Sequence, residues 1–133
     1  MKFDEMKEIV ARNPFAVLIG MELLEAADGH ARARIRLQPR LTNIYGGMHG
    51  GCAFALADTL AGIAAATYGD HVTTLDASVN YMRPVTGTQY LYCEADVQRN
   101  GNKISVVCTK LMDDHGKLLI QGNFTYYHLD FAE

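Results

Sequence analysis

The segment from Asn43 to Asp58, NIYGGMHGGCAFALAD, gathers the residues of this chain that could do chemistry. Its two glycine pairs would let a backbone approach a ligand closely and adopt angles that other residues avoid. The second pair, Gly50-Gly51, opens an apolar run long enough to be a helix. The N–H groups of these glycines would then be unpaired donors at the positive end of the helix dipole. Such donors can stabilise an oxyanion or bind an anion.

Two polar residues flank this helix start. His49 directly precedes the glycine pair, and Asp58 is the only charged residue between Gly50 and Thr67. An unpaired buried carboxylate is costly, so Asp58 needs a partner or a task. It either caps or pairs within the structure, or it is a general base or nucleophile tuned by its apolar surroundings. The residue pattern alone leaves both interpretations open.

The distance between Gly50 and Asp58 limits how they could cooperate. Asp58 follows Gly50 by eight positions, which is about 12 Å along a helix. One substrate carbonyl cannot easily touch both ends of that span. If both groups act on one carbon, Asp58 comes from a second subunit, so the spacing predicts a site between subunits.

Other reactive residue types have simpler interpretations. Cys52 lies in the first turn of the expected helix and could form a Cys/His pair with His49, but a small core residue is the favoured reading. Arg32, Arg34 and Arg36 share one face of an expected strand. A solvated face is favoured for them over phosphate binding, for which arginine is also suited.

The elements that must position these residues follow from periodicity. A short amphipathic helix carries Phe3, Met6, Ile9 and Val10, with Asp4 expected as its cap and Pro14 as its stop. Two strands, Ala16–Ala26 and His30–Leu37, are expected to form a hairpin through the turn at 27–29.

A long helix is expected over Gly51–Tyr68, apolar nearly all round and therefore buried. Four strands follow at His71–Met82, Tyr90–Gln98, Lys103–Met112 and Leu118–Leu129, with a two-residue hairpin signal at Asn100-Gly101. The whole is an α+β domain over residues 1–133, in which one curved antiparallel sheet covers a buried helix. A sheet edge and part of the helix stay uncovered, which favours an oligomer.

Composition excludes several classes of protein. The 133 residues are 49% hydrophobic and 20% charged, with a net charge of −3, which argues against a nucleic-acid partner. Three widely spaced cysteines and an N-terminus without an apolar signal region favour the cytoplasm, and no stretch favours a membrane span. The five histidines show no metal-binding spacing, and no serine-hydrolase elbow or nucleotide-binding loop is present.

The run Asn43-x-x-Gly46-x-x-His49-Gly50-Gly51 with Asp58 downstream resembles the hotdog-fold acyl-CoA thioesterases of the phenylacetate-degradation type. The segment NYMRP at 80–84 and the hairpin RNGNK at 99–103 are also similar to that family. The resemblance covers about residues 15–128 in the right element order. It implies a hotdog fold, a homodimer doubled to a tetramer, no metal or redox cofactor, and hydrolysis of an acyl-CoA to a carboxylic acid and coenzyme A.

The resemblance also implies roles for single residues. Gly50 would polarise the thioester carbonyl, His49 would orient the loop, and Asn43 would lie near the carbonyl or the attacking water. Asp58 of the partner subunit would be base or nucleophile, and Thr74 would hold the water, with Thr73 one residue away as the alternative.

The residues themselves suggest further substrate contacts. An acyl pocket could be lined by Tyr45, Met48, Phe54 and Tyr81, and the phosphates of coenzyme A could be bound by Arg83, Arg99 and Lys103, which flank loops near the strand ends. Gly51 is also expected to contact the substrate.

The sequence is also compatible with two rival functions. A hotdog dehydratase would use a histidine and an acid, but the YGGMHGG setting of His49 does not resemble the dehydratase pattern. A non-catalytic binder or sensor of acyl-CoA would keep the glycine loop and would have no need of Asp58.

Overall fold

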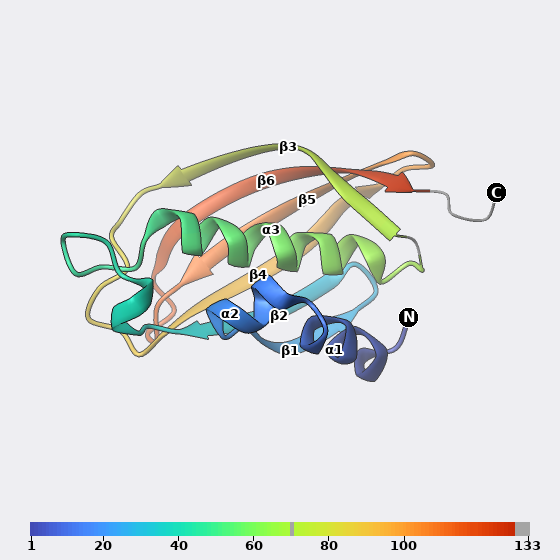
Figure 1. Ribbon diagram of the computed structural model, residues 1–133. Coiled ribbons are helices and arrows are strands. Elements are labelled where there is room, and N and C mark those ends of the chain that lie inside the picture. The colour runs from blue at the N-terminus through green and yellow to red at the C-terminus, as the bar shows by residue number, and fades with distance from the viewer. Residues whose placement is uncertain (70, 130–133) are drawn as a thin grey trace.

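The computed structural model describes residues 1–69 and 71–129. Six antiparallel strands form one sheet in the order β1-β2-β4-β5-β6-β3, and the sheet curves around the long helix α3 (Figure 1). The expected hotdog arrangement is therefore confirmed. The elements are α1 (Phe3–Ala11), α2 (Pro14–Ile19), β1 (Glu22–Ala27), β2 (His30–Arg36), the 3-10 turn η1 (Pro39–Leu41), α3 (Gly50–Ala66), β3 (His71–Tyr81), β4 (Tyr90–Asn100), β5 (Ile104–Met112) and β6 (Leu118–Leu129).

Helix α3 is the centre of the core. Its alanines and leucines favour a helix, and its apolar surface is buried on nearly every side, with Leu56 and Leu60 fully shielded from solvent. It starts one residue before the expected Gly51 and ends two before the expected Tyr68. Thr67 ends it, because the Thr67 hydroxyl donates to the carbonyl of Ala64 at 2.7 Å and also accepts the Gly29 N–H at 2.8 Å.

The expected strand over Ala16–Ala26 is wrong in its first half. Residues Pro14–Ile19 form the short helix α2 instead. The Asn13 side chain accepts the N–H groups of Phe15 and Ala16, and Pro14 sits at the first helical position, where its missing N–H costs nothing. Gly20 then ends α2 in the left-handed conformation at φ 74°. The proline that was expected only to stop α1 also starts the next helix.

The expected cap of α1 is wrong as well. The helix begins at Phe3 with Lys2 in the capping position, so Asp4 lies inside the first turn. There its carboxylate still faces the positive end of the helix dipole.

The hairpin expected at Asn100-Gly101 is present with a longer connection. β4 runs to Asn100 and β5 starts at Ile104, and the Gly101 N–H closes the turn on the Ile104 carbonyl at 2.8 Å.

Strand β3 is one edge of the sheet. Its alternation is interrupted by a bulge between Thr74 and Asp76. Of its apolar residues, Leu75 and Tyr81 are 55% and 51% exposed, whereas Ala77 and Val79 are half-buried against the core. The expected apolar face of this strand is therefore only partly covered within one chain.

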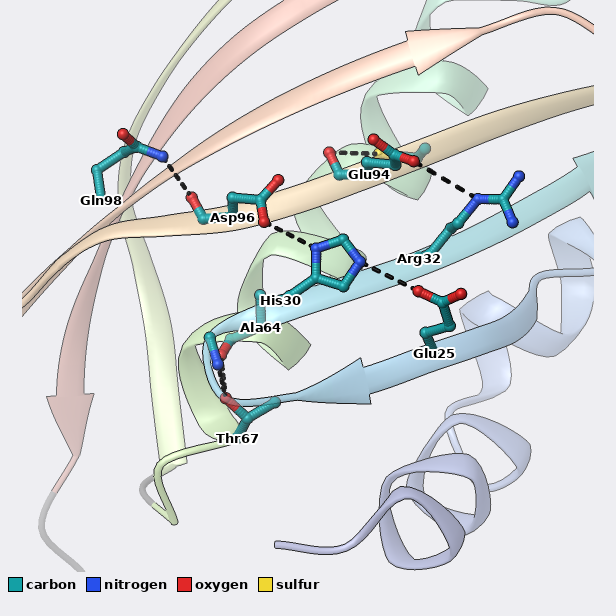
Figure 2. A network of polar contacts seen from close by, with 10 residues as sticks. Glu25, His30, Arg32, Ala64, Thr67, Glu94, Asp96 and Gln98 are labelled. Carbon is teal, nitrogen blue, oxygen red and sulfur yellow. Dashed lines mark hydrogen bonds and ion pairs between the residues drawn. The ribbon is translucent and has the colours of Figure 1, made fainter. Parts of the chain in front are cut away.

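The outer face of β1, β2 and β4 carries a network of ion pairs (Figure 2). His30 of β2 contacts Asp96 of β4 at 2.7 Å and Glu25 of β1 at 3.2 Å, so one imidazole links three strands. We call these three residues the His30 clasp.

In the part of the chain that is described, no helix combines the length and apolar character needed to cross a membrane.

Arg32 and Arg34 of β2 belong to the same network of ion pairs. Arg34 pairs with Glu22 at 3.1 Å, and Arg32 lies 3.7 Å from Glu94. Arg34 also stacks over the ring of Tyr90 at 4.1 Å. These contacts support the interpretation of a solvated structural face for Arg32 and Arg34.

Candidate active site

The structure distinguishes the two glycine amides at the start of α3, which the residue pattern without the family resemblance did not. The Nδ1 atom of His49 accepts the N–H of Gly51 at 2.8 Å, so His49 is the N-cap of α3. The Gly50 N–H has no acceptor among the described residues. Gly50 is thus the helix-opening amide that remains free for a ligand, while the Gly51 amide is already used.

Gly50 faces a pocket of about 250 Å³, which we call the Gly50 pocket. Its wall includes four of the other predicted site residues: Asn43, Met48, Tyr81 and Arg83. The Tyr81 hydroxyl donates to the Gly50 carbonyl at 2.9 Å, and the ring lies close to the Gly50 backbone. Tyr81 therefore holds the helix start against the end of β3.

His49 and Gly51 face a different pocket, of about 340 Å³, together with Cys52 and with Phe15 and Leu18 of α2. The His49 ring is therefore not in the Gly50 pocket, and its observed contact is with the helix backbone. Burial raises the pKa of the Cys52 thiol, which disfavours the thiolate. This supports packing rather than a Cys/His nucleophile.

Asp58 lines a third pocket, of about 510 Å³, between α1, α3, β3 and β6; we call it the Asp58 pocket. Much of its wall is apolar, including Met6, Val10 and Ile63. The Thr74 hydroxyl donates to Asp58 Oδ1 at 2.8 Å. Of the two threonines considered from sequence, Thr74 is the one that makes this hydrogen bond.

Tyr126 is a site residue that sequence reasoning missed. Its hydroxyl donates to Asp58 Oδ1 at 2.8 Å and also contacts the Asp58 main-chain carbonyl. The side chain is 2% exposed, and burial, followed by the negative charge of Asp58, raises the pKa of Tyr126 far above its usual range. The available signal was a phenol on the inward face of the last strand, since a buried tyrosine hydroxyl usually needs a partner.

Two predicted pocket residues lie elsewhere within this chain. The Asn43 side chain accepts the Tyr45 N–H at 2.8 Å and so shapes the loop, but the Tyr45 side chain is 86% exposed at the loop tip. Phe54 packs against Phe124 in the core, with ring centres 5.6 Å apart.

Arg99 and Lys103 lie in the β4–β5 hairpin, by the far end of α3 from Gly50. The β4 residue Val97 bonds to Gly29, and Gly29 bonds to Thr67 at the end of α3, which fixes this placement. Only Arg83 of the three predicted basic residues lies in the Gly50 pocket. Within the described ranges, no group of three or more His, Cys, Asp or Glu side chains is arranged to hold a metal ion.

Comparison with known proteins places this arrangement in a family. The model of the family described as "Thioesterase superfamily" matches residues 45–120, which include His49, Gly50, Asp58 and Thr74. A putative esterase of Halobacterium salinarum is 35% identical over 96 residues, covering 66% of this chain and 62% of that protein. This chain thus spans less than two thirds of that relative's length.

Two further proteins are similar over most of the chain. Human acyl-coenzyme A thioesterase 13 is 28% identical over 118 residues, covering 86% of this chain and 84% of that protein. The solved structure of the PaaI protein from the phenylacetic acid degradation operon of E. coli matches with a TM-score of 0.88 at 19% identity, covering 92% of this chain and 89% of that one. At this identity the match shows a shared fold. Since the family model covers more than half of the 133 residues, this chain belongs to the thioesterase superfamily.

Proposed function

We propose that this protein hydrolyses an acyl-CoA thioester to a carboxylic acid and coenzyme A. The observation that carries the proposal is Asp58, a half-buried carboxylate in an otherwise apolar helix, at the wall of an apolar pocket. Membership of the thioesterase superfamily and similarity to an acyl-coenzyme A thioesterase support it.

The Gly50 amide would bind the thioester carbonyl oxygen. Negative charge develops on that oxygen as the carbonyl carbon is attacked, and the free N–H at the positive end of α3 stabilises it. One such donor is typically worth about 10²–10³ in rate.

Asp58 would bring about the attack on the carbonyl carbon, either as a general base or as the nucleophile. As a base, it takes a proton from water, and the water oxygen adds to the carbon. As a nucleophile, it adds directly and forms an anhydride, which water then hydrolyses. In both routes the C–S bond breaks and the coenzyme A thiolate leaves and takes up a proton. Because the single Thr74 proton is donated to Asp58, Thr74 could hold the water only as an acceptor.

We infer that each site combines Gly50 of one subunit with Asp58 of another. Within one chain the two residues line separate pockets and lie about 12 Å apart along α3. The edge strand β3 exposes Leu75 and Tyr81, which supports pairing of this edge in a dimer, doubled to a tetramer. With the two helices antiparallel, the hairpin of one subunit, carrying Arg99 and Lys103, would approach the Gly50 pocket of the other. These residues and Arg83 would then bind the phosphates of coenzyme A.

Release of free coenzyme A thiol from aryl and from short-, medium- and long-chain acyl-CoAs tests the proposal. We expect turnover by the wild type and a loss of at least about 10²-fold in Asp58→Asn. Asp28→Asn is the matched control, because Asp28 is an exposed carboxylate in the β1–β2 turn, away from the β3 edge and outside the Asp58 pocket.

The possible results separate the parts of the proposal. An Asp58→Asn variant as active as wild type would overturn the role of Asp58 and leave the hydrolase standing. If the wild type turns over no acyl-CoA, hydrolysis is wrong, and calorimetry with the same panel would then test the rival function of acyl-CoA binding.

A further inference from the structure

The Asp58 carboxylate is held from one side only. The hydroxyls of Thr74 and Tyr126 both donate to Oδ1, each at 2.8 Å. Oδ2 has no donor within residues 1–69 and 71–129. The two oxygens of one carboxylate therefore have different surroundings.

Two donors on one oxygen fix the direction of the whole group. Thr74 comes from the edge strand β3 and Tyr126 from β6, its neighbour in the sheet, where the two residues are paired opposite each other. The Tyr126 hydroxyl has one proton, which it shares between Oδ1 at 2.8 Å and the Asp58 main-chain carbonyl at 2.5 Å, so Tyr126 holds the side chain and the helix backbone at once. Charge-assisted hydrogen bonds of this kind are stronger than neutral ones.

We propose that Tyr126 is a positioning residue that, with Thr74, holds Asp58 by Oδ1 and leaves Oδ2 as the oxygen that takes the proton or attacks the thioester. This rests on the proposed function. In this arrangement Oδ1 accepts the hydrogen bonds that orient the carboxylate, and Oδ2 is the reacting oxygen.

Tyr126 is suited to this task because it is buried and remains a donor. It is 2% exposed, so water does not compete for its hydroxyl. Burial and the Asp58 charge both raise the pKa of Tyr126, so the phenol keeps its proton throughout the working pH range. Both interpretations of Asp58 from the sequence are then compatible, since it is paired through one oxygen and reactive through the other.

Among the residues that the structure describes, few other titratable groups face this carboxylate. His71 of β3 and the amino terminus at Met1 belong to residues that line the Asp58 pocket. The buried Cys93 thiol of β4 adds a small contribution that raises the pKa of Tyr126. On α3 itself, Asp58 is the only charged side chain.

The test compares Tyr126→Phe with Tyr127→Phe. Both changes remove one phenolic hydroxyl from β6, but Tyr127 is 37% exposed and is not part of the Asp58 pocket. We expect Tyr126→Phe to lower kcat about 10- to 100-fold, the usual worth of a hydrogen bond to a charged group, with KM changed less than about twofold. Tyr127→Phe should match the wild type in both kcat and KM.

A purely structural role for Tyr126 would lower thermal stability and leave kcat and KM as in Tyr127→Phe, and that result would overturn the proposal. Crystal structures of both variants supply a readout that needs no turnover. A carboxylate that turns or takes two orientations in Tyr126→Phe supports positioning, and one that stays in place overturns it. If the wild type hydrolyses no acyl-CoA, it is the proposed function that fails, and the crystal structures still decide what orients Asp58.

If Tyr126→Phe does not fold, proton NMR of the wild type and of Asp58→Asn replaces it. We expect a slowly exchanging Tyr126 hydroxyl proton in the wild type that shifts in Asp58→Asn. The same resonance at the same position in both proteins would overturn the assignment.

Discussion

A charged side chain persists inside an apolar helix only where the surroundings compensate for its lost hydration. For Asp58 the compensation is two hydroxyl donors from β3 and β6. These donors explain how α3 tolerates the charge, and they do not use the second carboxylate oxygen. At the scale of single residues, structural pairing and catalysis are therefore not alternatives for this aspartate.

A second charged group with a defined environment is His30, on the opposite face of the sheet. The hydrogen bond to Asp96, followed by the charges of Asp96 and Glu25, raises the pKa of His30 against a lowering effect of burial. Folding therefore favours the protonated imidazole. Its stabilising contribution is complete below the ordinary histidine pKa of about 6.5 and is lost as the pH rises through the raised value.

We expect His30→Gln to reduce the part of the unfolding free energy that is lost between about pH 6 and pH 8. The effect should stay below about 1 kcal/mol, because the clasp is solvent-exposed and screened. Urea unfolding at the two pH values measures it. His115→Gln, in the exposed β5–β6 turn, is the control and should keep the wild-type difference. A His30→Gln variant with the same pH dependence as the control would show that the clasp adds no stability.

At the scale of elements, the start of α3 is the feature with most chemical consequence. His49 occupies the Gly51 N–H, and the Gly50 N–H stays free. The glycine pair is thus one capped amide and one open amide. A mutation can separate the two, because the first helical position tolerates proline.

Gly50→Pro removes the open N–H and keeps the helix. His49 already has φ −59° and ψ 133°, a conformation suited to the residue before a proline. Gly50→Ala is the matched control, since it keeps the N–H and adds a Cβ that would meet the Tyr81 ring at 3.4 Å, an ordinary contact. We expect Gly50→Pro to have a kcat about 10²–10³-fold below that of Gly50→Ala, with equal helix content by circular dichroism. Equal kcat values would remove the Gly50 amide from the mechanism.

At the scale of the whole molecule, the separation of Gly50 and Asp58 leads to a prediction about how subunits assemble. If each site takes one residue from each subunit, two defective chains can complement each other. A heterodimer of Gly50→Pro and Asp58→Asn would carry both defects in one site and none in the other.

We expect heterodimers purified with two different tags to regain about half of the wild-type activity per dimer, while both homodimers stay inactive. Thiol release by the three purified species measures this. Heterodimers no more active than the homodimers would mean that Gly50 and Asp58 of one chain serve the same site, and the interface site would be wrong.

Much of the architecture could be read from local pattern. Alternation located the strands, and the alanine-rich run located α3 within two residues at each end. The resemblance to the thioesterase family, carried by the residues from Asn43 to Asp58, is confirmed by the family match. The prediction for the N-terminal region is wrong because Ala16–Ala26 is apolar without clear periodicity. Pro14 before this segment and Gly20 within it therefore determined the conformation.

Local sequence is enough to predict the order of elements, the buried helix opened by glycines, and the one carboxylate on that helix, because each depends on neighbours a few residues apart. Tertiary packing was needed to show that His49 and Gly50 face different pockets and that Tyr126 contacts Asp58. That contact joins residues 68 positions apart. It depends on the strand register, which aligns Tyr126 with Thr74, and on the way the curved sheet wraps α3. Such contacts arise when distant segments pack into one core, and no local pattern encodes them.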